Sequence, residues 1–391
     1  MGCKISKVRL VLYISLIPLL VILYHLFLAQ EDYQLEQIHL NLDDKAYDRL
    51  ADIRDRAIDK GYLEREDDDY VPADLIYQSQ VKEGVVRLKG DWLDHLDDDN
   101  WSFRVKLDDP MQDGLKIFSV QNPECRGHLK AYVFYNLMRE NGIVCNQFRV
   151  VELIVNGDSW GVYFLEEHLT SRMIATSNKP EGVLLKYNDQ SFFEASIKEE
   201  STKGLVENAK IKVYGDLKKS DRHGYELQLA NQILRNYQKQ TDSVYSYFDP
   251  EVMGRFYALC DLTGGYHAMG WTNMRFYFNF ETKQMEPVAY DPYPIMDWGK
   301  PYLGAHYSTY ENDPLDVKSM IYAALKNERI NFYYNQYLNK YLKNGVMEDF
   351  LDRHHSELEF LEKELQKEFG SYSFDQQFFL DQVEGIRQAR K

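Results

Sequence analysis

An apolar run of twenty residues without a formal charge, from Leu10 to Ala29, constrains this chain more than any other feature of its sequence. At about 1.5 Å of rise per residue, a helix of that length crosses the roughly 30 Å hydrocarbon core of a bilayer. All charges before residue 31 are positive, at Lys4, Lys7 and Arg9. The positive-inside rule therefore predicts one signal-anchor helix, a cytoplasmic N-terminus and an extracytoplasmic main domain after Gln30.

A cleaved signal peptide is the alternative interpretation of the same segment. Its apolar region would normally span only about 7–15 residues and end at a small-residue cleavage site. The run from Leu10 to Ala29 is longer, and no clean A-x-A site closes it. The pattern therefore favours a single-pass membrane protein.

The overall charge excludes one class of partner. The chain has 46 Lys and Arg against 62 Asp and Glu, for a formal net charge of −16. No local basic patch offsets this excess, so we expect no binding to nucleic acid. Beyond Cys3, the cysteines are Cys125, Cys145 and Cys260, without C-x-x-C spacing. They leave open one disulfide bridge or buried free thiols, of which the thiols are favoured.

Alternating apolar and polar residues dominate the first half of the exported part. The acidic segment from Gln30 to Asp69 is predicted to be helical and to end in a solvated stalk. Strands are predicted within Ala73 to Leu88 and Trp101 to Leu107, paired as a hairpin. A second hairpin joins Phe148 to Val155 with Trp160 to Leu165, because Asn156-Gly157 is a strong turn signal.

Helical spacing of apolar residues becomes more frequent later in the chain. Helices are predicted over Arg126 to Asn141, within Asp216 to Tyr247 and over Val252 to Leu262. Arg275 to Phe280 and Met285 to Tyr290 alternate like a pair of strands. Nearly everything after Val317 is predicted to be helical. The sequence thus indicates an α+β domain with antiparallel strands first and a helical C-terminal part.

The segment from Asp261 to Pro294 is the most suggestive for chemistry. It places His267 and Asn273 in a Gly-containing loop and Asp291 just after an apolar strand. An Asn side chain and a carboxylate at adjacent strand ends can hold Mg²⁺ against nucleotide phosphates. The alternative, that Asn273 and Asp291 only cap turns, is slightly favoured by the spacing alone.

A second suggestive segment runs from Arg87 to Leu107. It carries Lys89, Arg104 and Lys106 on strands beside a loop containing Gly90, where cations and backbone N–H groups could hold phosphate. No recognised phosphate loop is present, so these bases can equally be ordinary exposed strand residues.

Several segments together resemble a known family. They read, in chain order, RLKGDW, WSFRVKL, KIFSVQNPECR, VVELIVNGDSWGVYFLEEH and NMRFYFN followed by MEPVAYD. In this order they resemble the CotH family of spore-coat-protein-H-like, secreted atypical kinases. The resemblance runs from about Val81 to about Asp297.

This resemblance implies a protein-kinase-like fold that binds ATP with Mg²⁺ or Mn²⁺ and phosphorylates Ser or Thr. Asn273 and Asp291 match the metal-binding residues of the family. Glu166 or Glu167 falls in its G-x-Y-x-x-E element, with Glu166 as our choice. The phosphate-contacting base is expected among three residues that the resemblance does not separate, Arg104, Lys106 and Lys116.

One position departs from the family pattern. Better-known members carry a catalytic Asp five or six residues before the Asn, where this chain has His267-Ala268. A histidine has an unperturbed pKa of about 6.5 and can accept the proton of a hydroxyl group near neutral pH. We therefore expect an atypical protein kinase with His267 as base, and keep a non-catalytic pseudokinase that binds or assembles envelope or coat components as the alternative.

The expected organisation follows from these segments. Residues 1–30 form the cytoplasmic stub and anchor, 31–72 a helical acidic stalk, 73–310 the CotH-like kinase domain and 311–391 a helical extension packed on it. The expected partners are the membrane, through the N-terminal helix, and an envelope or coat protein as the phosphate acceptor.

Overall fold

The structure is a computed structural model and describes residues 33–64, 66, 69–90, 92–96, 100–202, 204–214, 223–239, 242–293 and 324–391. The predicted membrane helix, Leu10 to Ala29, lies outside the described residues. Among the helices that are described, none has the length and apolarity needed to cross a membrane. Residues from Glu36 to Lys391 form one compact unit.

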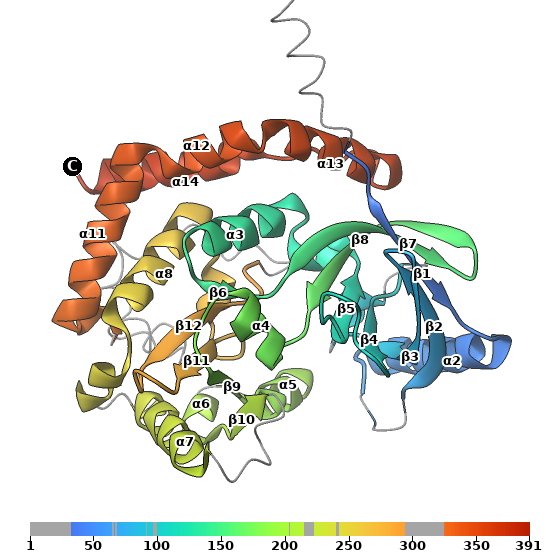
Figure 1. Ribbon diagram of the computed structural model, residues 1–391, viewed down its shortest axis with the longest axis horizontal. Coiled ribbons are helices and arrows are strands. Elements are labelled where there is room, and N and C mark those ends of the chain that lie inside the picture. The colour runs from blue at the N-terminus through green and yellow to red at the C-terminus, as the bar shows by residue number, and fades with distance from the viewer. Residues whose placement is uncertain are drawn as a thin grey trace, which may run out of the picture. The chain divides into compact units, whose positions relative to one another are not determined.

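A closed β-barrel makes up the first part of this unit (Figure 1). Its strands follow the spatial order β1-β2-β3-β4-β5-β8-β7, and a parallel pairing of β1 with β7 closes it. The other pairings in the barrel are antiparallel. The strands are β1 (Glu36–Asn41), β2 (Val71–Tyr77), β3 (Gln80–Leu88), β4 (Phe103–Leu107), β5 (Ile117–Gln121), β7 (Phe148–Val155) and β8 (Asp158–Glu167).

The closed barrel corrects the predicted fold class. A protein-kinase-like domain was expected, with antiparallel strands first, and that prediction is wrong because seven strands close on themselves. The mixed helix and strand content that we predicted is present. The error has a physical cause. Alternation of apolar and polar residues predicts that a segment is a strand, but it does not identify the strand with which that segment pairs. The pairing of Ile38 with Leu153 joins residues too distant in sequence for any local pattern to show.

The barrel interior holds the hydrophobic core expected from strand alternation. On β4, Phe103, Val105 and Leu107 are buried in this core. Arg104 and Lys106 alternate with them and lie on the outer face of the barrel. Helix α2 (Asp44–Lys60) packs against β2 and β3.

A five-stranded sheet forms the centre of the second part, in the order β10-β9-β11-β12-β6. Its strands are β6 (Val144–Cys145), β9 (Gly182–Tyr187), β10 (Ile211–Tyr214), β11 (Arg275–Asn279) and β12 (Met285–Ala289). Helices and short 3₁₀ turns surround it (Figure 1). They are α3 (Leu129–Glu140), α4 (Ser171–Thr176), α5 (Gln190–Ile197), α6 (Leu205–Asn208), α7 (Gly224–Gln238), α8 (Pro250–Thr263), η5 (Asp242–Tyr247) and η6 (Tyr266–Met269). Two further 3₁₀ turns, η1 (Leu93–His95) and η2 (Pro123–Arg126), contact each other, and η2 also contacts β8 and α3.

Most local predictions are confirmed. The Asn156-Gly157 turn joins β7 to β8, and both residues have the positive φ that this turn type needs. The prediction for Gln30 to Asp69 holds only for α2, because β1 before it is a strand of the barrel. The stretch from Ala73 to Leu88 is itself a hairpin, which turns at Gln78 and Ser79. The predicted pairing across the acidic loop, now β3 with β4, is confirmed.

Four C-terminal helices contact both parts of the unit (Figure 1). Helices α11 (Glu328–Asn344) and α14 (Gln376–Ala389) pack on α8, while α12 (Val346–Arg353) leads into α13 (His355–Glu368), which packs on β8. The Glu368 carboxylate accepts a hydrogen bond of 2.8 Å from the Val162 backbone N–H. A Cβ at Gly161 would lie 2.1 Å from this carboxylate, and the φ of +85° at Gly161 disfavours residues other than glycine.

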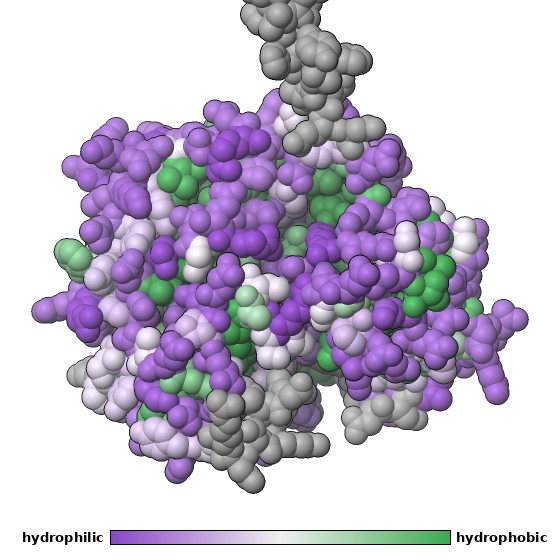
Figure 2. All heavy atoms as spheres, viewed as in Figure 1, coloured by the Kyte–Doolittle hydropathy of each residue, from purple (hydrophilic) through white to green (hydrophobic). Residues whose placement is uncertain are grey.

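Polar side chains dominate the surface face shown in Figure 2. This agrees with a chain in which 28% of residues are charged. The large hydrophobic side chains recorded as exposed are scattered over separate elements: Ile58, Val81, Trp92, Tyr225, Tyr247 and Phe332. Such single residues are normal on a folded surface and mark no interface by themselves.

Candidate active site

A buried polar network begins just past the end of β3. The Lys89 side chain follows Leu88 and is 6% exposed. Its Nζ donates a 2.5 Å hydrogen bond to Gln121 Oε1, and Gln121 Nε2 donates a 2.8 Å bond to Glu166 Oε2. Three strands of the barrel thus bring a cation, an amide and a carboxylate together. We call Lys89, Gln121, Arg126, Glu166 and Asp291 the Glu166 network.

Arg126 joins the barrel carboxylate to a carboxylate of the second part. Its Nε donates a 3.0 Å hydrogen bond to Glu166 Oε2, and its Nη1 lies 3.1 Å from Asp291 Oδ1. The second contact is an ion pair and lacks hydrogen-bond geometry. The buried Asp291 Oδ1 therefore has no hydrogen-bond partner among the described residues. Arg126 is 5% exposed, so both contacts are shielded from water.

The backbone at Asp291 has an unusual conformation. Asp291 follows β12 and Tyr290 with φ of +49°, in the left-handed region that non-glycine residues seldom adopt. Its N–H donates a 2.9 Å hydrogen bond to the Tyr135 hydroxyl on α3, which holds this conformation in place. Non-glycine residues in such conformations cluster at functional sites.

His267 and Asn273 lie beside Asp291, as the sequence predicted. His267 Nε2 lies 3.8 Å from Asp291 Oδ2. Asn273 Nδ2 donates a 3.3 Å hydrogen bond to the His267 backbone carbonyl, which ties the two residues of the loop together. The His267 N–H in turn donates to the Pro292 carbonyl at 3.2 Å. The structure therefore brings together the three residues singled out between Asp261 and Pro294.

Charge and burial set the protonation states of the network. Burial raises the pKa of Glu166, but Arg126 and Lys89 outweigh burial and hold it at about 2. Glu166 is therefore ionised throughout the physiological range. Burial, and then Arg126, lower the pKa of Lys89 well below its usual value. Additional negative charge beside Lys89 would favour its protonated form.

The environment of His267 favours its neutral form. Burial lowers its pKa, Asp291 raises it, and Arg126 lowers it, with a net decrease from 6.5. A neutral imidazole accepts a proton, which is the property that a general base needs near pH 7.

Asp291 and Asn273 offer oxygen ligands of the kind that Mg²⁺ prefers. The unsatisfied buried Oδ1 of Asp291 fits this role. The adjacent guanidinium of Arg126 opposes a further cation at the same oxygen. The donor set therefore fits a divalent cation, in competition with Arg126.

The three bases proposed as phosphate contacts lie in different surroundings. Arg104 is partly buried, and its Nη1 contacts His168 Nδ1 at the boundary between the barrel and the sheet. Lys106 and Lys116 are exposed, and Lys116 Nζ donates to the Asp108 carbonyl. Of the three, Arg104 is the one in a buried polar environment.

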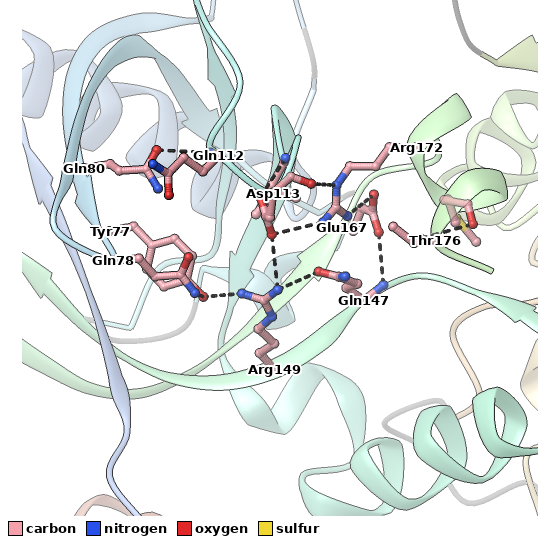
Figure 3. Close-up of polar contacts among 12 residues, drawn as sticks. Tyr77, Gln78, Gln80, Gln112, Asp113, Gln147, Arg149, Glu167, Arg172 and Thr176 are labelled. Carbon is pink, nitrogen blue, oxygen red and sulfur yellow. Dashed lines mark hydrogen bonds and ion pairs between the residues drawn. The ribbon is translucent and has the colours of Figure 1, made fainter. Parts of the chain in front are cut away.

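Glu167, the neighbour of Glu166, belongs to a separate network shown in Figure 3. Arg172 Nη1 donates a 2.8 Å hydrogen bond to Glu167 Oε1 and its Nη2 a 3.0 Å bond to Asp113 Oδ2. Arg149 Nη2 reaches the same Asp113 oxygen at 3.3 Å. We call Asp113, Gln147, Arg149, Glu167 and Arg172 the Glu167 network. It does not include Asp291 or Lys89, which supports the choice of Glu166 for the site.

The sequence prediction missed Arg126 and Gln121, and it named Lys89 only as one of several bases that could hold phosphate. All three lie in segments that carried the family resemblance, KIFSVQNPECR and RLKGDW. That location is the signal that could have identified them. The three cysteines Cys125, Cys145 and Cys260 are free and buried, as favoured.

Comparison with known proteins assigns the family. The model for the family described as CotH kinase protein matches residues 86–388, most of the chain. A search of curated proteins finds no match. The matched region begins in β3 and ends in α14, so it includes the C-terminal helices and every residue of the Glu166 network. The chain therefore belongs to the CotH family.

Proposed function

We propose that this CotH family protein transfers the γ-phosphoryl group of ATP to a Ser or Thr hydroxyl of an envelope or coat protein. The observation that carries the proposal is the proximity of a partly buried imidazole to the carboxylate of a residue with a strained backbone: His267 Nε2 lies 3.8 Å from Asp291 Oδ2. Family membership supports phosphoryl transfer as the chemistry.

Each residue of the site has a defined task in this proposal. His267 accepts the proton of the acceptor hydroxyl as its oxygen attacks the γ-phosphorus and the bond to the β–γ bridging oxygen breaks, releasing ADP. Asp291 stabilises the imidazolium that forms. Lys89 and Arg126, positioned by Glu166, place positive charge beside the reacting phosphate.

Asp291 and Asn273 would hold the divalent cation that accompanies the nucleotide. Bound Mg²⁺ or Mn²⁺ would neutralise charge on the phosphate oxygens. The hydrogen bond from Asn273 to the His267 carbonyl fixes the loop that carries both side chains.

Location is part of the same proposal. The apolar run from Leu10 to Ala29, preceded by Lys4, Lys7 and Arg9, supports anchoring in a membrane with the catalytic region outside the cytoplasm. The acceptor would then be a protein of that compartment.

A non-catalytic binding or assembly protein is the second candidate. One observation favours it: Arg126 Nη1 lies 3.1 Å from Asp291 Oδ1, an oxygen that the metal would need. If Arg126 keeps this place, the site binds partners without turnover.

Labelled transfer separates the two candidates. The full chain in detergent is incubated with γ-labelled ATP, Mg²⁺ or Mn²⁺ and a generic protein acceptor, beside Asp291→Asn and His267→Gln. We expect His267→Gln to retain nucleotide binding and to lower transfer about 10²- to 10⁴-fold. Asp291→Asn should lose transfer and metal-dependent binding.

Asp113→Asn is the matched control, because Asp113 also pairs with arginines but lies in the Glu167 network. It should leave transfer unchanged. Absence of label in the parent, or equal label in parent and Asp291→Asn, would reject the enzymatic proposal and favour the binding protein.

A further inference from the structure

Two short 3₁₀ turns bring together three side chains of different chemistry. Asp94 and His95 lie in η1, Cys125 lies in η2, and the two turns contact each other. A carboxylate oxygen, an imidazole nitrogen and the sulfur of these three residues all lie within 4.8 Å of one another. Elsewhere in the part of the chain that the structure describes, no three His, Cys, Asp or Glu side chains lie close enough to share an ion. We call Asp94, His95 and Cys125 the thiol cluster.

The thiol cluster is largely shielded from water. His95 and Cys125 are buried, and the Asp94 side chain, 23% exposed, is the member that reaches the surface. Asp94 Oδ1 is nevertheless buried and has no hydrogen-bond partner among the described residues. Buried polar atoms are seldom left unsatisfied, so this oxygen needs an explanation.

The fold fixes the backbone of η1 around the cluster. The His95 carbonyl accepts a 2.8 Å hydrogen bond from the Ser102 N–H, and Cys125 Sγ donates to the Asp94 carbonyl at 3.0 Å. Gly90 has φ of +109°, and a Cβ there would lie 2.5 Å from the His95 ring. Glycine at this position therefore leaves the space that the imidazole occupies.

The turn that carries Cys125 is held in a similar way. The Asn122 side chain accepts a 3.0 Å hydrogen bond from the Glu124 N–H at the start of η2. The Asn122 N–H donates to Ser102 Oγ at 3.0 Å, so Ser102 is bonded to the residues of both turns. The three side chains thus meet in a preformed site, which lowers the entropic cost of binding a ligand.

The donor set selects the class of ligand. A thiolate and an imidazole bind zinc and similar transition metals, whereas Mg²⁺ takes oxygen ligands. Ligand atoms about 2.0–2.3 Å from a tetrahedral zinc ion lie about 3.3–3.6 Å apart. His95 Nε2 and Asp94 Oδ2 are 3.9 Å apart, and the widest separation in the cluster is 4.8 Å or less. Side-chain shifts of about 1 Å therefore complete the geometry.

Charge balance accounts for the cations nearby. Burial raises the pKa of both Asp94 and Cys125, while Arg126 and then Lys89 of the Glu166 network act in the opposite direction. These two cations would oppose an uncompensated positive charge in the cluster. A thiolate and a carboxylate together cancel the two charges of Zn²⁺, so the complex carries no net charge beside Arg126.

We propose that Asp94, His95 and Cys125 bind one Zn²⁺ ion, with the fourth position open to water on the partly exposed side of Asp94. On binding, the Cys125 thiol releases its proton to solvent, and a sulfur–metal bond replaces the S–H bond. The thiol cluster shares no residue with Asn273 and Asp291. The inference therefore goes beyond the proposed function and does not depend on it.

Titration with Co²⁺ tests the site without any assay of phosphate transfer. The full chain in detergent is freed of metal with EDTA and titrated with Co²⁺, a coloured substitute for Zn²⁺. We expect a thiolate-to-cobalt charge-transfer band that reaches full height at one Co²⁺ per chain. Excess Zn²⁺ should remove the band, whereas excess Mg²⁺ should leave it unchanged because Mg²⁺ does not compete for a thiolate.

Two variants and one control assign the band to the cluster. Cys125→Ser should abolish the band. Cys145→Ser is the matched control, because Cys145 is also a free, buried thiol but lies in no such cluster of the described residues. It should keep the band at full height. Asp94→Asn retains the thiol and should keep the band, but it should weaken Co²⁺ binding by about tenfold or more, since even the loss of an outer-shell partner costs about 10–100-fold.

Thermal unfolding of each variant without metal identifies a folding defect, and Asp94→Asn decides if Cys125→Ser has one. The proposal is overturned if the parent shows no charge-transfer band, if a folded Cys125→Ser keeps it, or if Cys145→Ser loses it to the same extent. Binding of Co²⁺ by Asp94→Asn as tight as by the parent would also reject it.

Discussion

Glu166 and Glu167 are neighbours on one strand, yet they belong to networks of different character. In the Glu167 network, shown in Figure 3, Arg172 joins Glu167 to Asp113, and Arg149 adds a second cation to Asp113. Arg149 also donates to Gln147 at 2.8 Å. No polar side-chain atom of these five residues is among the buried atoms without a hydrogen-bond partner.

The Glu166 network is incomplete by the same measure. It contains Asp291, whose buried Oδ1 has no hydrogen-bond partner within the described residues and whose φ lies in the left-handed region. On the same face of the barrel, Arg104 Nε and Ser119 Oγ also have no hydrogen-bond partner among the described residues. Native structures rarely leave buried polar groups unsatisfied, so the Glu166 network needs an explanation that the Glu167 network does not. Adjacent residues of β8 thus belong to one network that is satisfied within the described residues and to one that is not.

Removing Arg126 should give the largest effect. Arg126→Met leaves Glu166 and Asp291 buried without their shared cation, and breaking such a pair costs about 3–5 kcal/mol. Urea unfolding of the full chain measures the loss. Arg126→Lys is the control: it keeps the charge but not the forked geometry, so it should lose less. Equal losses in both variants would show that the forked geometry of Arg126, and not its charge alone, stabilises the network.

The second-largest effect is expected in acid, which should weaken the Glu166 network. The folded-state pKa of Glu166, about 2, is below its usual 4.5, so its contribution to stability is complete above pH 4.5. It is lost as the pH falls from 4.5 towards 2, by about 3 kcal/mol in total. Urea unfolding at pH 6, 4.5 and 3 measures this slope, and Glu166→Gln should flatten it. An unchanged slope in the variant would assign the acid sensitivity to other groups.

Glu167→Gln should cost less and leave function intact. The amide keeps the shape of the side chain and can still accept from Arg172, so we expect a loss of about 1–2 kcal/mol. ATP binding and labelled transfer should match the parent. If this variant loses activity while Glu166→Gln retains it, the functional and structural roles are reversed.

The smallest effect is expected at the partly exposed end of the Glu167 network. Arg149 and Asp113 have side chains 27% and 29% exposed, so water can replace their contact. Arg149→Gln should change the free energy of unfolding by less than about 1 kcal/mol. A double-mutant cycle with Asp113→Asn measures the coupling between the two residues. Coupling well above this value would place the pair with the buried contacts.

Much of the local structure was predictable, because the signals that specify it lie within short segments of the sequence. The hairpin at Asn156-Gly157 and the helix α8 follow from turn chemistry and from apolar spacing within short segments. His267, Asn273 and Asp291 were singled out because the first two lie in one loop and Asp291 closely follows an apolar strand. The domain boundaries stay predictions, and the membrane helix lies outside the described residues.

Long-range pairing decided the rest. Neither the parallel contact of β1 with β7, which closes the barrel, nor the bridge from Arg126 to Asp291 has a local signature. The choice between Glu166 and Glu167 depended on which face of β8 meets Gln121 and Arg126.

The sequence by itself determined most of the strands, helices and turns, because these depend on side-chain periodicity and backbone preferences over a few residues. It also determined the family, because the order of the motifs survives in the chain. Only the tertiary structure decided which charges meet in the interior. Burial strengthens electrostatic interactions there, and it turned Lys89, Arg126, Glu166 and Asp291 from scattered charges into one site.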